Sequence, residues 1–166
     1  IAKEGADAWR KAIREAKVHT GWVKPDEAYE DACVEFVRRL LAPGPQNVFL
    51  KNFRPFQKRI AQFGIFNSLS QTLLKIASPG VPDFYQGGEL WDFSLVDPDN
   101  RRPVDYARRR KMLADIRLRE QKLEGLLAYL WYHRSDGGIK LFLIYRGLHL
   151  RAQYRKIFDA GQHIPR

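Results

Sequence analysis

The chain has 166 residues, of which 45% are hydrophobic and 13% aromatic, and its net charge is +10. This is the size of one ordinary domain, and the apolar content argues against a largely disordered chain. The single cysteine, Cys33, excludes an internal disulfide and fits a reducing compartment. No apolar run approaches the roughly 18 residues that cross a bilayer. The charged start has no initiator Met and no signal-peptide pattern. We therefore expect a cytoplasmic protein without a membrane partner, cut from a longer chain.

The basic residues are spread along the sequence, and most alternate with apolar positions at helical spacing. This pattern is typical of solvated helix faces, so we expect no nucleic-acid partner. The alternative is a basic helical nucleic-acid-binding module that uses Arg101, Arg102 and residues 108–111. Steeply salt-dependent binding to DNA or RNA would favour that alternative.

The first elements in chain order are helical. Apolar residues at three- and four-residue steps predict a helix from Ala6 to Ala16. Pro25 suits the first position of a second helix, whose apolar stripe ends before Pro43 and Gly44. We expect residues 1–44 to form a helical hairpin.

Further helices are predicted on both sides of a Pro- and Gly-rich segment. From Gln46 onward one helical stretch is expected to break or restart at Pro55, and another begins after Gly64 and ends before Ser78. Helical spacing returns after Pro103. The run 139–145 fits a strand or a helix equally well, and we favour a helix.

Residues 78–106 hold four prolines and three glycines and show no helical period. Residues 81–85 are interpreted as a short buried strand, and a loop of this length is usually functional. This strand leads into a turn that carries Tyr85, Gln86 and Glu89, and Trp91 follows. Aromatic faces beside planar polar groups are what sugar sites use. The plainer interpretation is a loop held by carboxylate-to-backbone hydrogen bonds, with Trp91 in the core.

The stretch VDPDNRRPVDY supplies the candidates Asp99 and Arg102, either as sugar contacts or as turn-forming residues. It lacks the ligand spacing of a calcium loop. The sequence also has no Gly-rich phosphate loop, no paired-cysteine zinc pattern and no HExxH. We therefore predict no metal site and no cofactor.

The segment SPGVPDFYQGGELWDFSLVDPDNRRPVDY resembles the region around the last barrel strand of maltooligosyltrehalose synthases, a family of the α-amylase superfamily. The resemblance extends through REAKVHTGWVKPDEAYEDACVEFVRRLL, FGIFNSLSQTLLKIASPGVPD and DGGIKLFLIYRGL, and so covers nearly the whole chain. Gly21, Lys24 and Gly88 depart from the family, which more often has Ser, Asn and Thr there.

The resemblance implies a mainly α fold with minor β: a helical fragment from the C-terminal half of such an enzyme, holding the last strand and flanking helices of a (β/α)8 barrel. Residues 1–44 would be an insertion and residues 45–120 the last βα portion, with the active-site loop at 78–106. Residues 121–166 would begin a C-terminal region. A lone strand at 81–85 would pair with another copy or be only partly strand-like. We expect the fragment to self-associate through surface that the missing barrel would cover.

The resemblance also implies an activity in trehalose biosynthesis. The α-1,4 bond at the reducing end of a maltooligosaccharide becomes an α,α-1,1 bond by intramolecular transglycosylation. The family's catalytic carboxylates lie on earlier strands, so we assign no catalytic residue and expect the fragment alone to be inactive. The alternatives are another glucan hydrolase or transferase of the superfamily, or a helical scaffold with Trp9, Phe36 and Phe56 as anchors. The expected substrate contacts are Tyr85, Gln86, Glu89, Trp91, Asp99 and Arg102.

Overall fold

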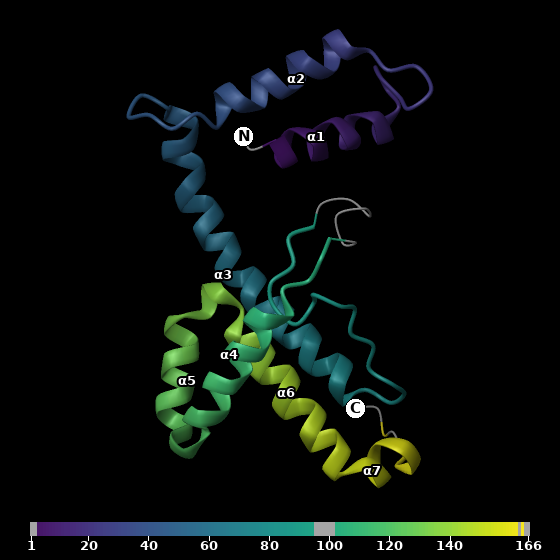
Figure 1. Cartoon of the computed structure of the whole chain (residues 1–166), viewed down its shortest axis with the longest axis vertical. Coiled ribbons are helices and arrows are strands. Elements are labelled where there is room, and N and C mark those ends of the chain that lie inside the picture. The colour runs from purple at the N-terminus through teal and green to yellow at the C-terminus, as the bar shows by residue number, and fades with distance from the viewer. Residues whose placement is uncertain (1–2, 95–101, 163, 165–166) are drawn as a thin grey trace. The chain divides into compact units, whose positions relative to one another are not determined.

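The structure, a computed structural model, describes residues 3–94, 102–162 and 164 (Figure 1). Contacts within the chain divide it into two compact units. Unit 1 is built on the residues up to Gln62, and unit 2 on residues 63–93 and the residues from 102 onward. Across the described residues, no helix is both long and apolar enough to cross a membrane.

Unit 1 begins with the predicted helical hairpin, which the structure confirms. Helix α1 (Lys3–Ala16) and helix α2 (Glu27–Leu40) pack against each other. Helix α2 begins two residues later than Pro25 suggested. Asp26 caps it, because its side chain accepts a hydrogen bond of 3.0 Å from the backbone N–H of Tyr29. Such a cap satisfies one of the free N–H groups at a helix start.

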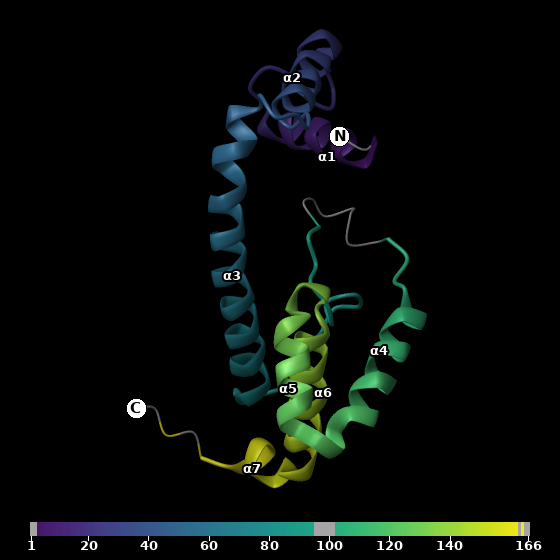
Figure 2. The same cartoon turned by 90° about the vertical axis from the view of Figure 1, so that its left-hand side faces the viewer.

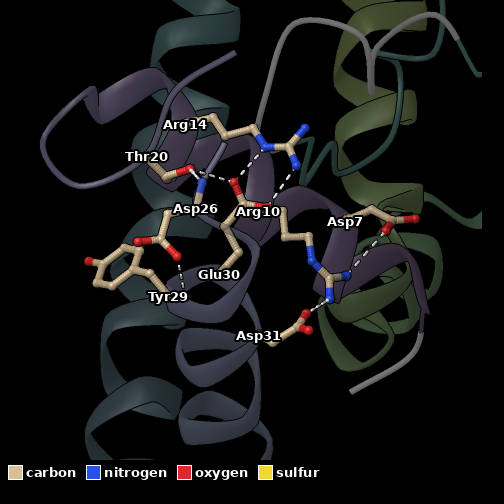
Figure 3. Close-up of polar contacts among 8 residues, drawn as sticks. All are labelled: Asp7, Arg10, Arg14, Thr20, Asp26, Tyr29, Glu30 and Asp31. Atoms are coloured by element: carbon tan, nitrogen blue, oxygen red, sulfur yellow. Dashed lines mark hydrogen bonds and ion pairs between the residues drawn. The ribbon is translucent and has the colours of Figure 1, made fainter. Parts of the chain in front are cut away.

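A buried ionic network joins α1, α2 and the loop between them (Figure 3). Glu30 is 1% exposed, and both of its carboxylate oxygens accept hydrogen bonds of 2.7 Å from the Arg14 guanidinium. The Thr20 hydroxyl donates to the same carboxylate at 2.6 Å and accepts from the backbone N–H of Asp26 at 2.9 Å. The buried charge is therefore paired and fully hydrogen-bonded, which is the condition under which a charge can be buried.

Helix α3 (Val48–Ala77) is one continuous helix of 30 residues, so the predicted interruptions at Pro55 and Gly64 are wrong. Its start is fixed by Asn47, whose Oδ1 accepts from the Leu50 N–H and whose Nδ2 donates to Leu40 O and Ala42 O. Proline removes one ladder hydrogen bond, and glycine keeps both of its backbone groups. In a helix of 30 residues, the single hydrogen bond lost at Pro55 does not end the helix, and Gly64 removes none.

Unit 2 surrounds an apolar core with helices, and the predicted helix over 139–145 is confirmed as part of α6. Helices α5 and α6 contact each other and lie next to each other in Figure 2, and α4 contacts both. Short 3-10 turns, Glu120–Lys122 and Arg134–Asp136, link the helices. The core is Leu90, Ile116, Leu126, Leu130 and Leu141. The helices of this unit after α3 are α4 (Tyr106–Arg119), α5 (Leu123–Tyr132), α6 (Gly138–Gln153) and α7 (Arg155–Ala160).

The mainly α fold is confirmed, but its minor β part is not found. None of the residues that the structure describes lies in a strand, and residues 81–85 are irregular rather than a buried strand. Val81 is 95% exposed. A strand needs a neighbour for its backbone hydrogen bonds, and the described residues offer this segment none.

Candidate functional site

The segment between α3 and α4 carries the residues that the sequence singled out. Its described part makes a tight turn after Tyr85, where the Gly88 N–H donates to Tyr85 O at 2.9 Å. Gly87 has a φ of +91°, a conformation that favours glycine. Leu90 then enters the core at 5% exposure. The turn is therefore a fixed feature of unit 2.

Arg109, on the first turn of α4, holds this turn from one side. Its Nε donates to Glu89 Oε2 at 2.8 Å and its Nη2 donates to Gly87 O at 2.8 Å. Its Nη1 donates to Asp105 O at 3.1 Å. The Arg109 and Glu89 side chains are 17% and 26% exposed, so this is a half-buried ion pair. Asp105 caps α4 by accepting from the Arg108 N–H, and this cap fixes the start of the helix that carries Arg109.

The predicted sugar contacts divide into exposed and anchored side chains. Tyr85 is 53% exposed, and Gln86 is exposed with its Oε1 accepting from the Tyr106 hydroxyl at 3.3 Å. Glu89 faces Arg109. Trp91 is half-buried, and its Nε1 donates to Arg134 O at 2.7 Å. The turn therefore presents Tyr85 and Gln86 as its exposed aromatic and amide groups.

Two further predicted contacts, Asp99 and Arg102, follow the turn in the sequence. Asp99 lies outside the described residues. Arg102 is described and exposed, just before the stretch that leads into α4. Within the described ranges, no group of three or more His, Cys, Asp or Glu side chains is arranged to hold a metal ion.

Sequence reasoning missed the cations that hold the segment. Arg151 of α6 donates from its Nη1 to Ile76 O at 2.6 Å and to Ser78 O at 2.8 Å, and also contacts Gly80 O. Lys140 of α6 donates to Leu90 O at 3.2 Å. Burial lowers the pKa of Lys140, and the positive charge of Lys75 acts in the same direction. The sequence had grouped Arg109 with Arg108 and Lys111 as a basic run, because spacing alone does not show which member turns inward.

Arg109 gives the first test of this site. Replacing Arg109 by alanine is expected to lower the free energy of unfolding by about 2 kcal/mol, because Glu89 and Gly87 O lose their partner. The Gly88 amide should also exchange with solvent faster. The matched control is Arg110→Ala, since Arg110 is the exposed neighbour, and it should change stability by no more than about 0.5 kcal/mol. Equal effects in urea unfolding and hydrogen exchange would contradict the role given to Arg109.

Comparison with known proteins identifies relatives that match three quarters or more of this chain. A Mycobacterium tuberculosis protein named as a maltooligosyl trehalose synthase is 44% identical over 125 residues, which are 75% of this chain and 16% of that protein. No protein-family model matches the chain.

Solved structures agree with that relative. The structure of a glycosyltrehalose synthase matches 100% of this chain and 20% of its own, with a TM-score of 0.80 and 36% identity. A crystal structure of a maltooligosyl trehalose synthase matches 95% of this chain and 21% of its own, with a TM-score of 0.77 and 35% identity. The chain therefore spans about a fifth or less of the length of these relatives. The resemblance that the sequence indicated is confirmed: the chain is homologous to a segment of the maltooligosyltrehalose synthases.

Proposed function

We propose that the chain is a segment of an enzyme that converts the reducing-end α-1,4 bond of maltooligosaccharides into an α,α-1,1 bond, as an intramolecular transferase of trehalose biosynthesis. The observation that carries the proposal is the 44% identity over 125 residues to a protein named for this activity. The anchored turn with exposed Tyr85 and Gln86 supports it, because it offers an aromatic face beside an amide.

The barrel placement is part of the proposal. Residues 81–85 would become the last strand of a (β/α)8 barrel once neighbouring strands from elsewhere in the enzyme pair with them. Tyr85, Gln86 and Glu89 would then lie at the C-terminal end of that strand, where barrel enzymes build their active sites. Residues 1–44 would be an insertion, and residues 121–166 the start of a further region.

Within this proposal, the chain contributes to glucan binding and supplies no catalytic carboxylate. A retaining transglycosylation uses a carboxylate nucleophile and a carboxylic acid about 5 Å apart. Glu89, the acid of the turn, is paired with Arg109 at 2.8 Å, so we assign it to holding the turn. Tyr85 and Gln86 would contact the glucan, and the loop would help to exclude water while the released glucose reattacks.

A chimera tests this proposal. Incubated with maltopentaose, the chain alone should give no non-reducing product. Placed in the Mycobacterium tuberculosis relative instead of the matching segment, it should support conversion. In that chimera, Tyr85→Ala should lower kcat/KM about tenfold, because a stacking contact is lost. Turnover by the isolated chain, or a folded chimera without turnover, would contradict the proposal.

The nucleic-acid-binding alternative is not favoured, because the relatives are named as maltooligosyl and glycosyl trehalose synthases. Arg109, from the basic run on which that alternative rested, is paired with Glu89. A cytoplasmic location belongs to the proposal, and its support is the unpaired thiol of Cys33.

A further inference from the structure

The loop between α1 and α2 displays apolar side chains to solvent. Trp22 is 51% exposed, Val18 is 73% exposed and Val23 is fully exposed. Residues 17–24 line a shallow, solvent-open hollow of about 540 Å³. Exposed apolar groups gathered on one loop often mark a binding surface.

The loop is held in one shape by the Glu30 network (Figure 3). Thr20, in the middle of the loop, is 5% exposed and donates a hydrogen bond to Glu30. Arg14 of α1 donates two hydrogen bonds to the same carboxylate. Lys17, at the loop's start, has a φ of +54°, an uncommon conformation for a residue with a side chain. Lys17 directly follows the last residue of α1, and helices often end in this left-handed conformation.

The Trp22 ring is itself fixed in orientation. Its Nε1 donates to Glu15 Oε1 at 2.8 Å, and the Arg14 guanidinium carbon lies 5.4 Å from the ring centroid. One edge of the indole and one side of it are thus occupied by α1, while half of its surface stays in water. Arg14 therefore connects the buried carboxylate of Glu30 to the exposed ring.

We propose that the Trp22 loop, residues 17–24 including Trp22, is an α-1,4-glucan-binding surface carried by unit 1, in addition to the Tyr85 turn of unit 2. This inference rests on the proposed function, because it assumes that the enzyme handles a glucan chain. A glucosyl ring has an apolar face that stacks on an immobilised indole, and a polar rim for hydrogen bonding. The hollow is lined by His19 and Lys24, which supply that hydrogen bonding. Arg14 is paired with Glu30, and the two lysines that line the hollow, Lys17 and Lys24, can donate hydrogen bonds to sugar hydroxyls.

The test uses the whole chain labelled with ¹⁵N, in which the indole N–H signals of Trp9, Trp22, Trp91 and Trp131 report separately. Maltoheptaose should shift the Trp22 signal with a saturable dissociation constant in the millimolar range, and cellohexaose should shift it less. The site of each shift also separates the Trp22 loop from the Tyr85 turn, which lies near Trp91 in sequence. No Trp22 shift with maltoheptaose would overturn the proposal. A Trp22 shift that follows protein dilution and not sugar would also overturn it, and would assign the surface to self-association.

Variants sharpen this test. Trp22→Ala should weaken maltoheptaose binding about tenfold, a loss of about 1.4 kcal/mol. Trp22→Phe should keep most of the binding. Trp9→Ala is the matched control, since Trp9 is 42% exposed on α1 of the same unit, and it should leave binding unchanged. Equal losses in Trp22→Ala and Trp9→Ala would overturn the proposal.

The chimera distinguishes this inference from the proposed function. There, Trp22→Ala should raise KM and leave kcat unchanged, because a stacking contact that is equally strong in the ground state and in the transition state contributes to binding alone. An active chimera that is indifferent to Trp22→Ala, with no glucan binding by the chain, would refute the Trp22 surface and leave the function standing. Glucan binding at Trp22 in a chain whose chimera makes no trehalose linkage would refute the function alone.

Discussion

Replacing Gly137 by alanine is expected to destabilise unit 2 by about 3 kcal/mol. Gly137 has a φ of +87°, and a Cβ there would lie 3.0 Å from Leu90 Cβ and 3.0 Å from the Trp91 backbone nitrogen. The left-handed conformation costs a residue with a Cβ about 1–2 kcal/mol. Overpacking against fixed atoms adds about 1–3 kcal/mol. Urea unfolding followed by circular dichroism measures the loss.

Gly125→Ala is the matched control for Gly137→Ala. Gly125 lies inside α5, and nothing lies within 4 Å of the position that a Cβ would take. Alanine there should stabilise the chain by about 0.5–1 kcal/mol, because it is the better helix former. The two variants add the same methyl group in the same unit and should change stability in opposite directions. A loss of similar size in both would refute the assigned clash at Leu90 and Trp91.

Glu30→Gln is expected to lower the melting temperature of unit 1 by on the order of 5–10 °C. Glutamine cannot balance the Arg14 guanidinium, whose side chain is 25% exposed and donates both of its bonds to Glu30. Glu35→Gln removes the same charge from the same helix. Glu35 pairs with Arg38 and Arg39 at the surface, where such pairs contribute little. Its melting temperature should therefore stay close to that of the unchanged chain, as followed through the Trp9 and Trp22 signals.

The pH dependence of the same network has a defined sign. Hydrogen bonds from Arg14 first, and then from Thr20, lower the pKa of Glu30 from its ordinary 4.5 to about 2. Because the folded pKa lies below the unfolded one, the stabilisation is complete above about pH 5 and is lost as the pH falls toward 2. The pKa of Glu35 is also lowered to about 2, by Arg38 and Arg39, but the Glu35 side chain is 37% exposed, and solvent screening makes its pairs contribute much less to stability than the buried pair of Glu30. Acid should therefore destabilise the Glu35→Gln variant almost as steeply as the unchanged chain, and the Glu30→Gln variant less steeply. An unchanged acid slope in Glu30→Gln would contradict the network's role.

The helices were predictable from the sequence because their apolar residues recur at helical spacing. The hairpin of α1 and α2 and the helical interpretation of residues 139–145 depended on such local patterns. The position of the segment after α3 was predictable for the same reason, since Pro79 and Gly80 end the helical pattern. Its content of Tyr85 and Gln86 made it a candidate site, and the structure leaves both exposed.

Other features depend on partners that are distant in sequence, and the pattern could not reveal them. Glu30 lies beside the apolar stripe of α2, but its burial depends on Arg14 and Thr20. The inward direction of Arg109 depends on Gly87 and Glu89, about twenty residues earlier. Pro55 looked like a helix end, because proline usually is one, and α3 continues through it.

The hydrogen bonds that hold the segment between α3 and α4 have an evolutionary consequence. Arg151, Arg109 and Lys140 all bind main-chain oxygens, at Ser78, Gly87 and Leu90 among others. A carbonyl is present whichever amino acid occupies a position. Mutation at Tyr85 or Gln86 can therefore change the side chains that the turn exposes while the path of the backbone is preserved. Selection can therefore vary the exposed surface of this turn without a loss of stability in the fold.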